Sequence, residues 1–178
     1  MSSEDGASNN ERLLAAARDD NEEMLTEVFE QGGFDINFQD GLGNTGTAVA
    51  LLSTNLIKPS AALHYAASLG STDVLELILE HEECDVDPIN RLEKATPLHL
   101  AVRIEDPELR VLVVSSLLDA GANTGIKDKN GDTVVEVAAG DVQVLALIRK
   151  ARAQAAVSLD DVASDDDASG SGSGSDDD

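Results

Sequence analysis

ALHYAASLG at positions 62–70 and TPLHLAV at 96–102 are the two stretches that decide the fold of this chain. Their histidines, His64 and His99, stand 35 residues apart. Each stretch is followed by a second segment whose apolar residues recur at helical spacing. A period of this length predicts a repeat protein in which one unit is a pair of helices.

Both stretches predict a helix, a tight turn and a second helix. Gly70 would supply the left-handed turn in the first of them. Pro97 stands at a helix start, where its missing N–H costs no hydrogen bond. From Thr96 to Gly121, the second of these units is about four residues longer than is usual for repeats of this kind. The extra residues fall around 104–108, in the turn between its two helices. The residues expected to face inward from the second helices are Val74, Leu75, Leu77, Ile78 and Leu79 in one unit and Val111, Leu112, Val114, Leu117 and Leu118 in the other.

Weaker copies of the pattern flank these two units. The copy that begins at Glu11 has Asp20-Asn21 in place of the turn glycine, and Asn tolerates left-handed geometry. The last copy has Thr133-Val134-Val135-Glu136 and then a helix expected from Val142 to about Gln154, whose last turn would place Arg149, Lys150 and Arg152 against the helix dipole. We therefore expect four units, the outer two being caps, at about 11–39, 40–89, 90–126 and 127–157.

This pattern resembles the ankyrin repeat, usually written T-P-L-H-x-A-A-x-x-G with a period of about 33 residues. The finger sequence D-x-x-G-x-T recurs at 128–133. The chain looks like a small, single-domain fungal ankyrin protein of poorly defined role. The resemblance implies an all-α solenoid with finger loops between its units. It also implies that His64 and His99 bond the backbone of neighbouring units, and that the chain binds proteins and is not an enzyme.

The finger before the first stretch is interrupted. Removing residues 46–61 joins 40–45 directly to Ala62-Leu63-His64 and restores the family pattern without a gap. Three explanations stay open: a passive elongated finger loop, a functional lid or binding loop, and a retained intron of 48 nucleotides translated in frame. Solenoids accept such insertions on one face.

The formal net charge is −23, and residues 158–178 contribute eight Asp and no Lys or Arg. This segment has low complexity and cannot bury enough apolar surface to fold, so we expect 158–178, like 1–10, to be disordered. The negative charge repels nucleic acid and anionic lipid and attracts a basic protein. Four serines with Asp three positions later resemble sites of acidophilic kinases: Ser158, Ser164, Ser173 and Ser175.

The sequence carries no pattern of a catalytic or metal site. It has neither a G-x-S-x-G elbow nor a phosphate-binding G-x-x-x-x-G-K-[ST] loop. His64 and His99 lie a whole repeat apart, too far to share a zinc ion, and His81 with Cys84 has no second pair of ligands. We expect no catalytic residue, cofactor or metal.

Location follows from what the chain lacks. No apolar run reaches the roughly 18–20 residues of a membrane helix, and the opening MSSEDGASNNE is too acidic for a secretory or mitochondrial signal. Cys84 is the only cysteine, which fits a reducing compartment. We expect a cytoplasmic and/or nuclear protein that is a monomer on its own and contacts neither nucleic acid nor membrane.

The likeness to ankyrin arrays puts a protein-binding surface on the concave ends of the first helices and on the finger tips. Leu42, Leu69, Leu92 and Ile104 would form an apolar stripe there. The candidate residues are Arg18, Asp19, Leu42, Asn44, Ser68, Leu69, Leu92, Glu93, Arg103, Ile104, Lys129, Asn130 and Asp132.

Two hypotheses of function follow. The first is an escort or chaperone-like binder of a basic protein, whose cations the acidic fingers and tail would mask. The alternative is a scaffold or inhibitor that docks on a folded enzyme or complex through the concave face, with the tail only solubilising.

Overall fold

The computed structural model describes residues 7–39 and 62–160, and these form four pairs of helices. Within this part of the chain there is no strand, only an isolated bridge between Lys127 and Thr133. The all-α prediction is confirmed. The helices are α1 (Asn9–Asp19) and α2 (Glu22–Gln31), α3 (Ala62–Leu69) and α4 (Thr72–Leu79), α5 (Pro97–Ala101) and α6 (Pro107–Asp119), and α7 (Val134–Val137) and α8 (Val142–Asp160).

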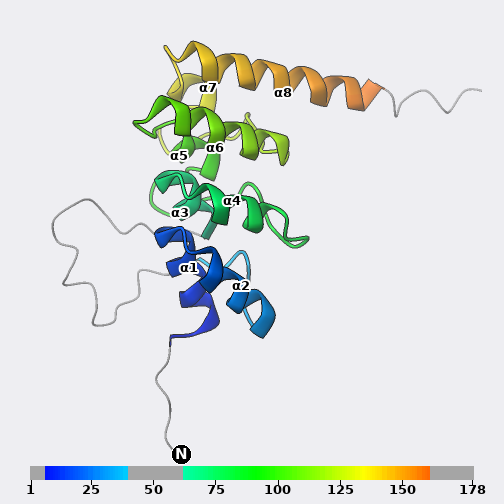
Figure 1. Cartoon of the computed structure of the whole chain (residues 1–178). Helices are drawn as coiled ribbons and strands as arrows, with labels where there is room; N and C mark the ends of the chain where they lie inside the picture. Colours follow the sequence, from blue (N-terminus) through cyan, green and yellow to red (C-terminus); the bar gives the residue numbers. More distant parts are fainter. Residues whose placement is uncertain (1–6, 40–61, 161–178) are drawn as a thin grey trace, which may run out of the picture.

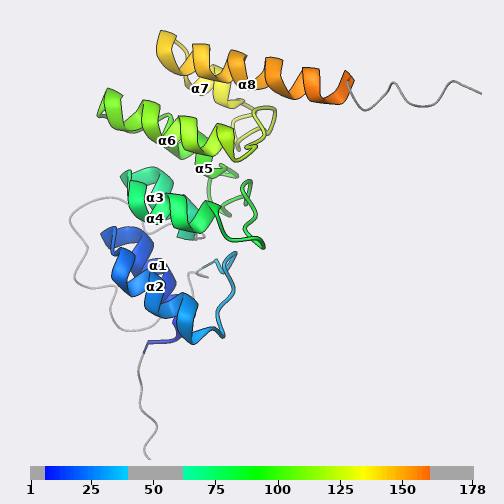
Figure 2. The same ribbon diagram turned by 45° about the vertical axis from the view of Figure 1, so that its right-hand side comes forward.

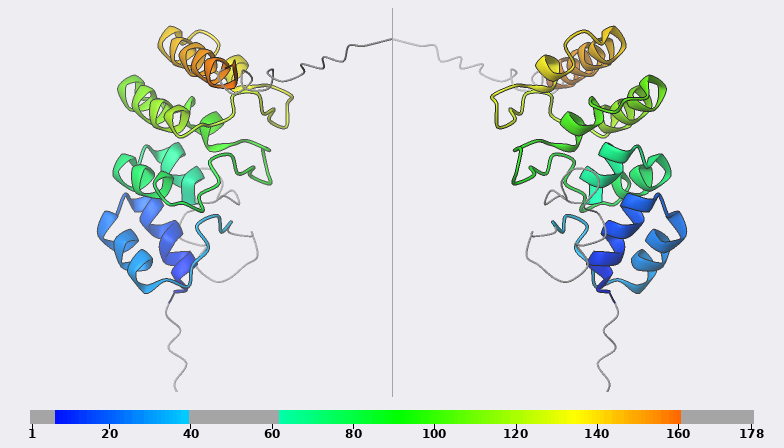
Figure 3. Two further views of the ribbon diagram at one scale, coloured as in Figure 1. Left: turned by 90° about the vertical axis from the view of Figure 1, so that its right-hand side faces the viewer. Right: turned by 90° about the vertical axis from the view of Figure 1, so that its left-hand side faces the viewer.

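The four pairs stack into a solenoid. The first helices α1, α3, α5 and α7 pack in one layer, and the second helices α2, α4, α6 and α8 in another (Figures 1 and 2). The described parts of the loops between pairs project from one side as fingers (Figure 3). We number the described units one (7–39), two (62–89), three (90–126) and four (127–157).

One apolar core runs through the whole stack. Paired alanines such as Ala66 and Ala67 are fully buried, and their small side chains let neighbouring first helices approach closely. Leucines and valines of the second helices close the core from the other layer. Burying each of these large side chains contributes about 1.5–3 kcal/mol, so every unit depends on its neighbour for cover.

Capping boxes begin units one, three and four. The Ser8 hydroxyl accepts a hydrogen bond from the Glu11 amide, and the Glu11 carboxylate accepts one from the Ser8 amide. The same reciprocal pairs join Thr96 to His99 and Thr133 to Glu136. Because Ser8 caps it, α1 begins at Asn9, two residues before the expected start, so the prediction that residues 1–10 are disordered is wrong for Asn9 and Asn10.

The turns between the paired helices of units one, two and four contain a left-handed residue. In unit one this residue is Asp20, with φ 49°, and not Asn21, which caps α2 by accepting a hydrogen bond from the Met24 amide at 2.9 Å. In unit two it is Gly70, with φ 76°. A β-carbon on Gly70 would lie 2.3 Å from Leu109 Cδ2, so a larger residue there would have to displace the Leu109 side chain as well as adopt a left-handed conformation.

The inward face of α6 differs from the one expected. Val113, Val114 and Leu117 are fully buried, whereas Leu112 is 50% exposed. The Asp106 side chain caps α6 at the end of the lengthened turn. The helix therefore begins at Pro107, and this start decides which side chains of α6 face the core. Leu112 lies about 100° around the helix from Val113, outside the buried stripe.

The last helix is longer than the sequence suggests. α8 continues past Gln154 to Asp160, so the acidic tail starts later than residue 158. Alanines at 151, 153, 155 and 156 have the highest helix propensity and carry the helix onward. Arg149 and Arg152 consequently lie in the middle of α8, and the predicted basic last turn is wrong.

Candidate protein-binding surface

Two buried histidines hold the fingers against the stack. His64 Nε2 lies 3.0 Å from the carbonyl oxygen of Ala95, and His99 Nε2 lies 3.3 Å from that of Asp132. The predicted structural role of both residues is confirmed. Burial lowers the pKa of both imidazoles from the ordinary histidine value, which favours the neutral ring.

A second row of side chains ties consecutive fingers together. Asn37 accepts a hydrogen bond from the Asp85 amide and donates one to the carbonyl of Glu83, both at 2.8 Å. One unit further on, both carboxylate oxygens of Asp87 accept from the Asn123 amide, at 2.9 and 3.0 Å. This row was not predicted from the sequence. Its signal is a polar residue two places after an aspartate in Asp-Ile-Asn and Asp-Val-Asp.

Arg103 and Glu93, two of the candidate binding residues, bridge fingers. Arg103 Nη1 lies 2.8 Å from a Glu93 carboxylate oxygen, and its Nη2 lies 3.5 Å from Asp128 Oδ2. The Lys129 amide donates to the carbonyl of Glu93 at 2.7 Å. These contacts fix the relative position of the fingers of units three and four.

The other candidates differ in exposure. Ile104 is only 8% exposed because the inter-helix turn folds it under, with its amide donating to the carbonyl of Ala101 at 3.1 Å. Leu69 ends α3 and Leu92 lies in a finger, and both are exposed, so of the described members of the predicted apolar stripe only the buried Ile104 is withdrawn from the surface. The exposed candidates are Arg18, Asp19, Ser68, Leu69, Leu92, Arg103, Lys129, Asn130 and Asp132, and Glu93 is partly exposed.

Several predictions lie outside the described residues. Leu42 and Asn44, the inserted segment 46–61, and Ser164, Ser173 and Ser175 belong to this group. Ser158 falls within α8, but its side chain is not described. Of the candidates that are described, Arg18 has a clear contact across units, since its guanidinium carbon lies 4.9 Å from the centre of the Tyr65 ring.

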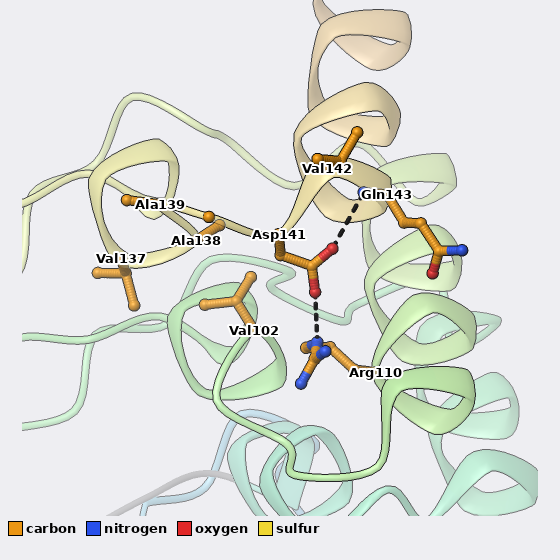
Figure 4. Close-up of a pocket in the computed structure, with 9 residues that line it drawn as sticks. Val102, Arg110, Val137, Ala138, Ala139, Asp141, Val142 and Gln143 are labelled. Atoms are coloured by element: carbon orange, nitrogen blue, oxygen red, sulfur yellow. Dashed lines mark hydrogen bonds and ion pairs between the residues drawn. The ribbon is translucent and has the colours of Figure 1, made fainter.

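An open groove of about 460 Å³ lies where units three and four meet, on the side of the inter-helix turns (Figure 4). Val102, Val137 and Val142 contribute apolar wall. The Arg110 Nε donates to Asp141 Oδ2 at 2.8 Å, and Asp141 also caps α8 through the amides of Gln143 and Val144. Because Arg110 and Asp141 pair with each other, we interpret the groove as a structural junction between units three and four.

The part of the chain that the structure describes contains neither a candidate metal site nor a helix that could span a membrane. Residues 7–39 and 62–160 bring together no group of three or more His, Cys, Asp or Glu side chains that could hold a metal ion. None of the described helices is long and apolar enough to cross a membrane. Burial raises the pKa of the Cys84 thiol to about 11, so it is protonated and a poor nucleophile at pH 7.

Charge is distributed unevenly along the stack. Unit one carries eight acidic and two basic residues, and unit two carries seven acidic residues and no Lys or Arg. Unit three has five acidic and four basic residues, and unit four has four acidic and five basic ones. The net charge therefore changes from −6 and −7 in the first two units to −1 and +1 in the last two.

The acidic side chains of α2 and α4 face solvent. Among the described residues of units one and two, a single ion pair involves them, between Arg12 and Glu27 at 2.5 Å. The exposed members, which we call the acidic outer face, are Glu22, Glu23, Glu27 and Glu30 of unit one and Asp73, Glu76, Glu80, Glu82 and Glu83 of unit two.

Comparison with known proteins agrees with this architecture. A family profile described as ankyrin repeats in three copies matches residues 13–109 and 63–158. A yeast ankyrin repeat-containing protein from Saccharomyces cerevisiae is 34% identical over 142 residues, covering 77% of this chain and 73% of that protein. Mouse ankyrin repeat and SOCS box protein 6 is 33% identical, covering 63% of this chain but only 30% of its own length.

A shorter match points the same way. The nuclear factor NF-kappa-B p105 subunit of chicken is 46% identical over 57 residues, which cover 31% of this chain and 5% of that protein. Ankyrin repeats form a protein–protein interaction module, and this fold is generally non-catalytic. The paired helices, the histidine-anchored fingers and the matched profile lead to one conclusion: this chain belongs to the ankyrin-repeat family.

Proposed function

We propose that this protein escorts a basic protein client, holding it through the acidic outer face of units one and two together with the acidic tail. The observation that carries the proposal is the net charge of those units, which totals −13. Among their described side chains, one ion pair involves a carboxylate of the acidic outer face. We also propose that it acts as a monomer in the cytosol and/or nucleus.

Most carboxylates of the acidic outer face have no cationic partner among the described side chains. Carboxylates that lack cationic partners create a negative potential over the outer helices, which speeds the encounter with a positively charged protein. Such a surface also covers exposed lysines and arginines of a client that would otherwise bind nucleic acid. The same field disfavours direct binding of DNA or RNA by this chain.

The alternative is docking on a folded enzyme or complex through the concave face. Leu92 and Lys129 on the fingers favour it, because both residues are exposed and could contact a partner. In this case the acidic tail would only add solubility. The two functions differ in their dependence on salt and on charge.

A binding assay on two matched variants separates them. The first replaces Glu30, Glu76, Glu80 and Glu82 of the acidic outer face by Gln. The second changes the net charge by the same amount elsewhere, through Glu105→Gln, Glu108→Gln, Asp119→Asn and Asp132→Asn. All eight side chains are exposed. The probe is poly-lysine, measured at about 10 mM and about 1 M salt, where the Debye length is about 30 Å and about 3 Å.

We expect the outer-face variant to weaken binding at low salt far more than the control variant does, and high salt to abolish the difference. A shorter chain ending at Asp160 keeps α8 whole and should also bind less poly-lysine. Equal loss in the two variants, or binding that is indifferent to salt, contradicts the escort function. Capture of cellular partners that survives all these changes would favour the concave-face alternative.

A further inference from the structure

Exposed cations gather in the middle of the C-terminal helix. Arg149 and Lys150 are exposed on α8, and no hydrogen bond or ion pair joins their side chains to another described residue. Arg152 follows on the same side of the helix as Arg149, since residues three apart are neighbours on a helix surface. We call these three residues the α8 basic surface.

A shallow groove adjoins this surface. It has a volume of about 360 Å³ and runs between the end of α6 and α8, with Leu118, Ala122 and Ala151 among its walls. Arg152 is held at its edge, because Nε donates to the Thr124 hydroxyl at 2.7 Å and Nη2 to the Thr124 carbonyl at 3.1 Å. The guanidinium is thereby presented in a fixed position beside an apolar channel.

The chain itself supplies a segment of opposite charge. Residues 161–178 contain seven Asp and no Lys or Arg, and they follow directly on α8. From Asp160 back to Arg149 is about 16 Å along the helix, whereas 18 extended residues span up to about 60 Å. The segment is therefore long enough to return along α8, and units one and two repel it.

We propose that residues 161–178 dock on the α8 basic surface and the adjoining groove of the same molecule. The contact is electrostatic and built from exposed ion pairs, each of which is weak and screened by salt. It does not depend on the nature of any client. A strongly basic protein that binds the tail would have to displace it, so the contact would set a threshold of positive charge for capture.

Paramagnetic relaxation in the full-length chain tests this contact. Cys84→Ser removes the native thiol, and Ser173→Cys provides a single site for a nitroxide spin label. In about 10 mM salt, where screening is weakest, the amide signals of residues 149–152 should lose most of their intensity. Those of α4, residues 72–79, should keep theirs, and about 1 M salt should restore the α8 signals.

Two charge-matched variants complete the test. Arg149→Gln with Lys150→Gln should restore the intensities of the α8 amides at low salt. Arg91→Gln with Lys94→Asn removes the same charge from a finger of unit three, and Asn suits the positive φ of 51° at position 94. This control should leave the α8 signals attenuated. Attenuation that is absent at low salt, spread equally over α4 and α8, or unchanged by the first pair of substitutions overturns the proposal.

Discussion

Units two and four have the same helical architecture and opposite charge character. In both, a capped or glycine-bounded turn separates a short first helix from a second helix whose apolar residues enter one shared core. Unit two has seven acidic residues and no Lys or Arg, whereas unit four has five basic residues against four acidic ones. The difference lies almost wholly on exposed positions.

We infer from this comparison that different residues determine the stability and the surface charge of this protein. Each unit is stabilised by the neighbour that covers its apolar face, and that requirement fixes the inward residues alone. The acidic outer face carries its charge on exposed side chains, of which Glu27 is ion-paired with Arg12. Substitutions in the core and at turns should therefore change the free energy of unfolding in either unit, and outer-face substitutions should change binding.

The largest expected effect is at the glycine turns. Gly70→Ala should lower the free energy of unfolding by about 2–4 kcal/mol, because φ is positive and the new methyl group meets Leu109. Gly140→Ala in unit four, with nothing within 4 Å, should cost only about 1–2 kcal/mol. Urea unfolding of both variants measures the difference. Equal losses would show that contact with Leu109 is unimportant.

Units two and four should also differ in how their stability depends on pH. Burial lowers the pKa of His64, so the unfolded chain binds a proton more readily and stability falls as the pH drops below 6.5. Glu136 occupies the corresponding place in unit four, and hydrogen bonds from Thr133 lower its pKa below 4.5. Its contribution should persist to below pH 4.5 before it is lost.

Urea unfolding at a series of pH values separates the two contributions. His64→Gln should flatten the stability curve between neutral pH and pH 5, while Glu136→Gln should leave that region unchanged and flatten it under more acid conditions. Identical curves for His64→Gln and the parent chain would contradict the assignment to the buried imidazole.

Caps at the two ends should have smaller and similar effects. Ser8→Ala in unit one and Thr133→Ala in unit four each remove half of a capping box, at a cost of about 1 kcal/mol. Amide hydrogen exchange should speed up in α1 for the first variant and in α7 for the second. Exchange that speeds up through the whole stack would mean that the units do not open separately.

The smallest effect is expected on the acidic outer face. Glu76→Gln with Glu80→Gln removes two exposed charges from unit two and should change stability by less than about 0.5 kcal/mol. Any change should be a gain at low salt, since repulsion between like charges is relieved. A loss as large as that of Gly70→Ala would show that these carboxylates are structural.

Much of the fold could be predicted from a few residues. Pro97, Gly70 and the His64–His99 spacing specify turns and units, because each residue type suits one backbone position. Helix ends were predicted less well, since α1 is extended by the Ser8 cap and α8 by its alanines. Leu112 and Val113 exchanged places because helix rotation depends on where α6 begins, which a longer turn conceals.

The candidate surface was harder to predict than the fold. Arg103 and Ile104 follow the first helix of unit three in positions that suggest exposure, yet one bridges two fingers and the other is buried. Such outcomes depend on contacts between units that no single repeat encodes. The charge difference between units, by contrast, is visible in the residues of each unit once the boundaries are known.

The most direct test of the account is a nuclear magnetic resonance titration of the full-length chain with an oligo-lysine peptide. Binding at low salt should shift the amide signals of α2, α4 and residues 80–85, and leave α6 and the first turns of α8 unaffected. Shifts spread evenly over the described units, or concentrated on unit four and the finger tips, would contradict the assignment of client binding to the acidic outer face.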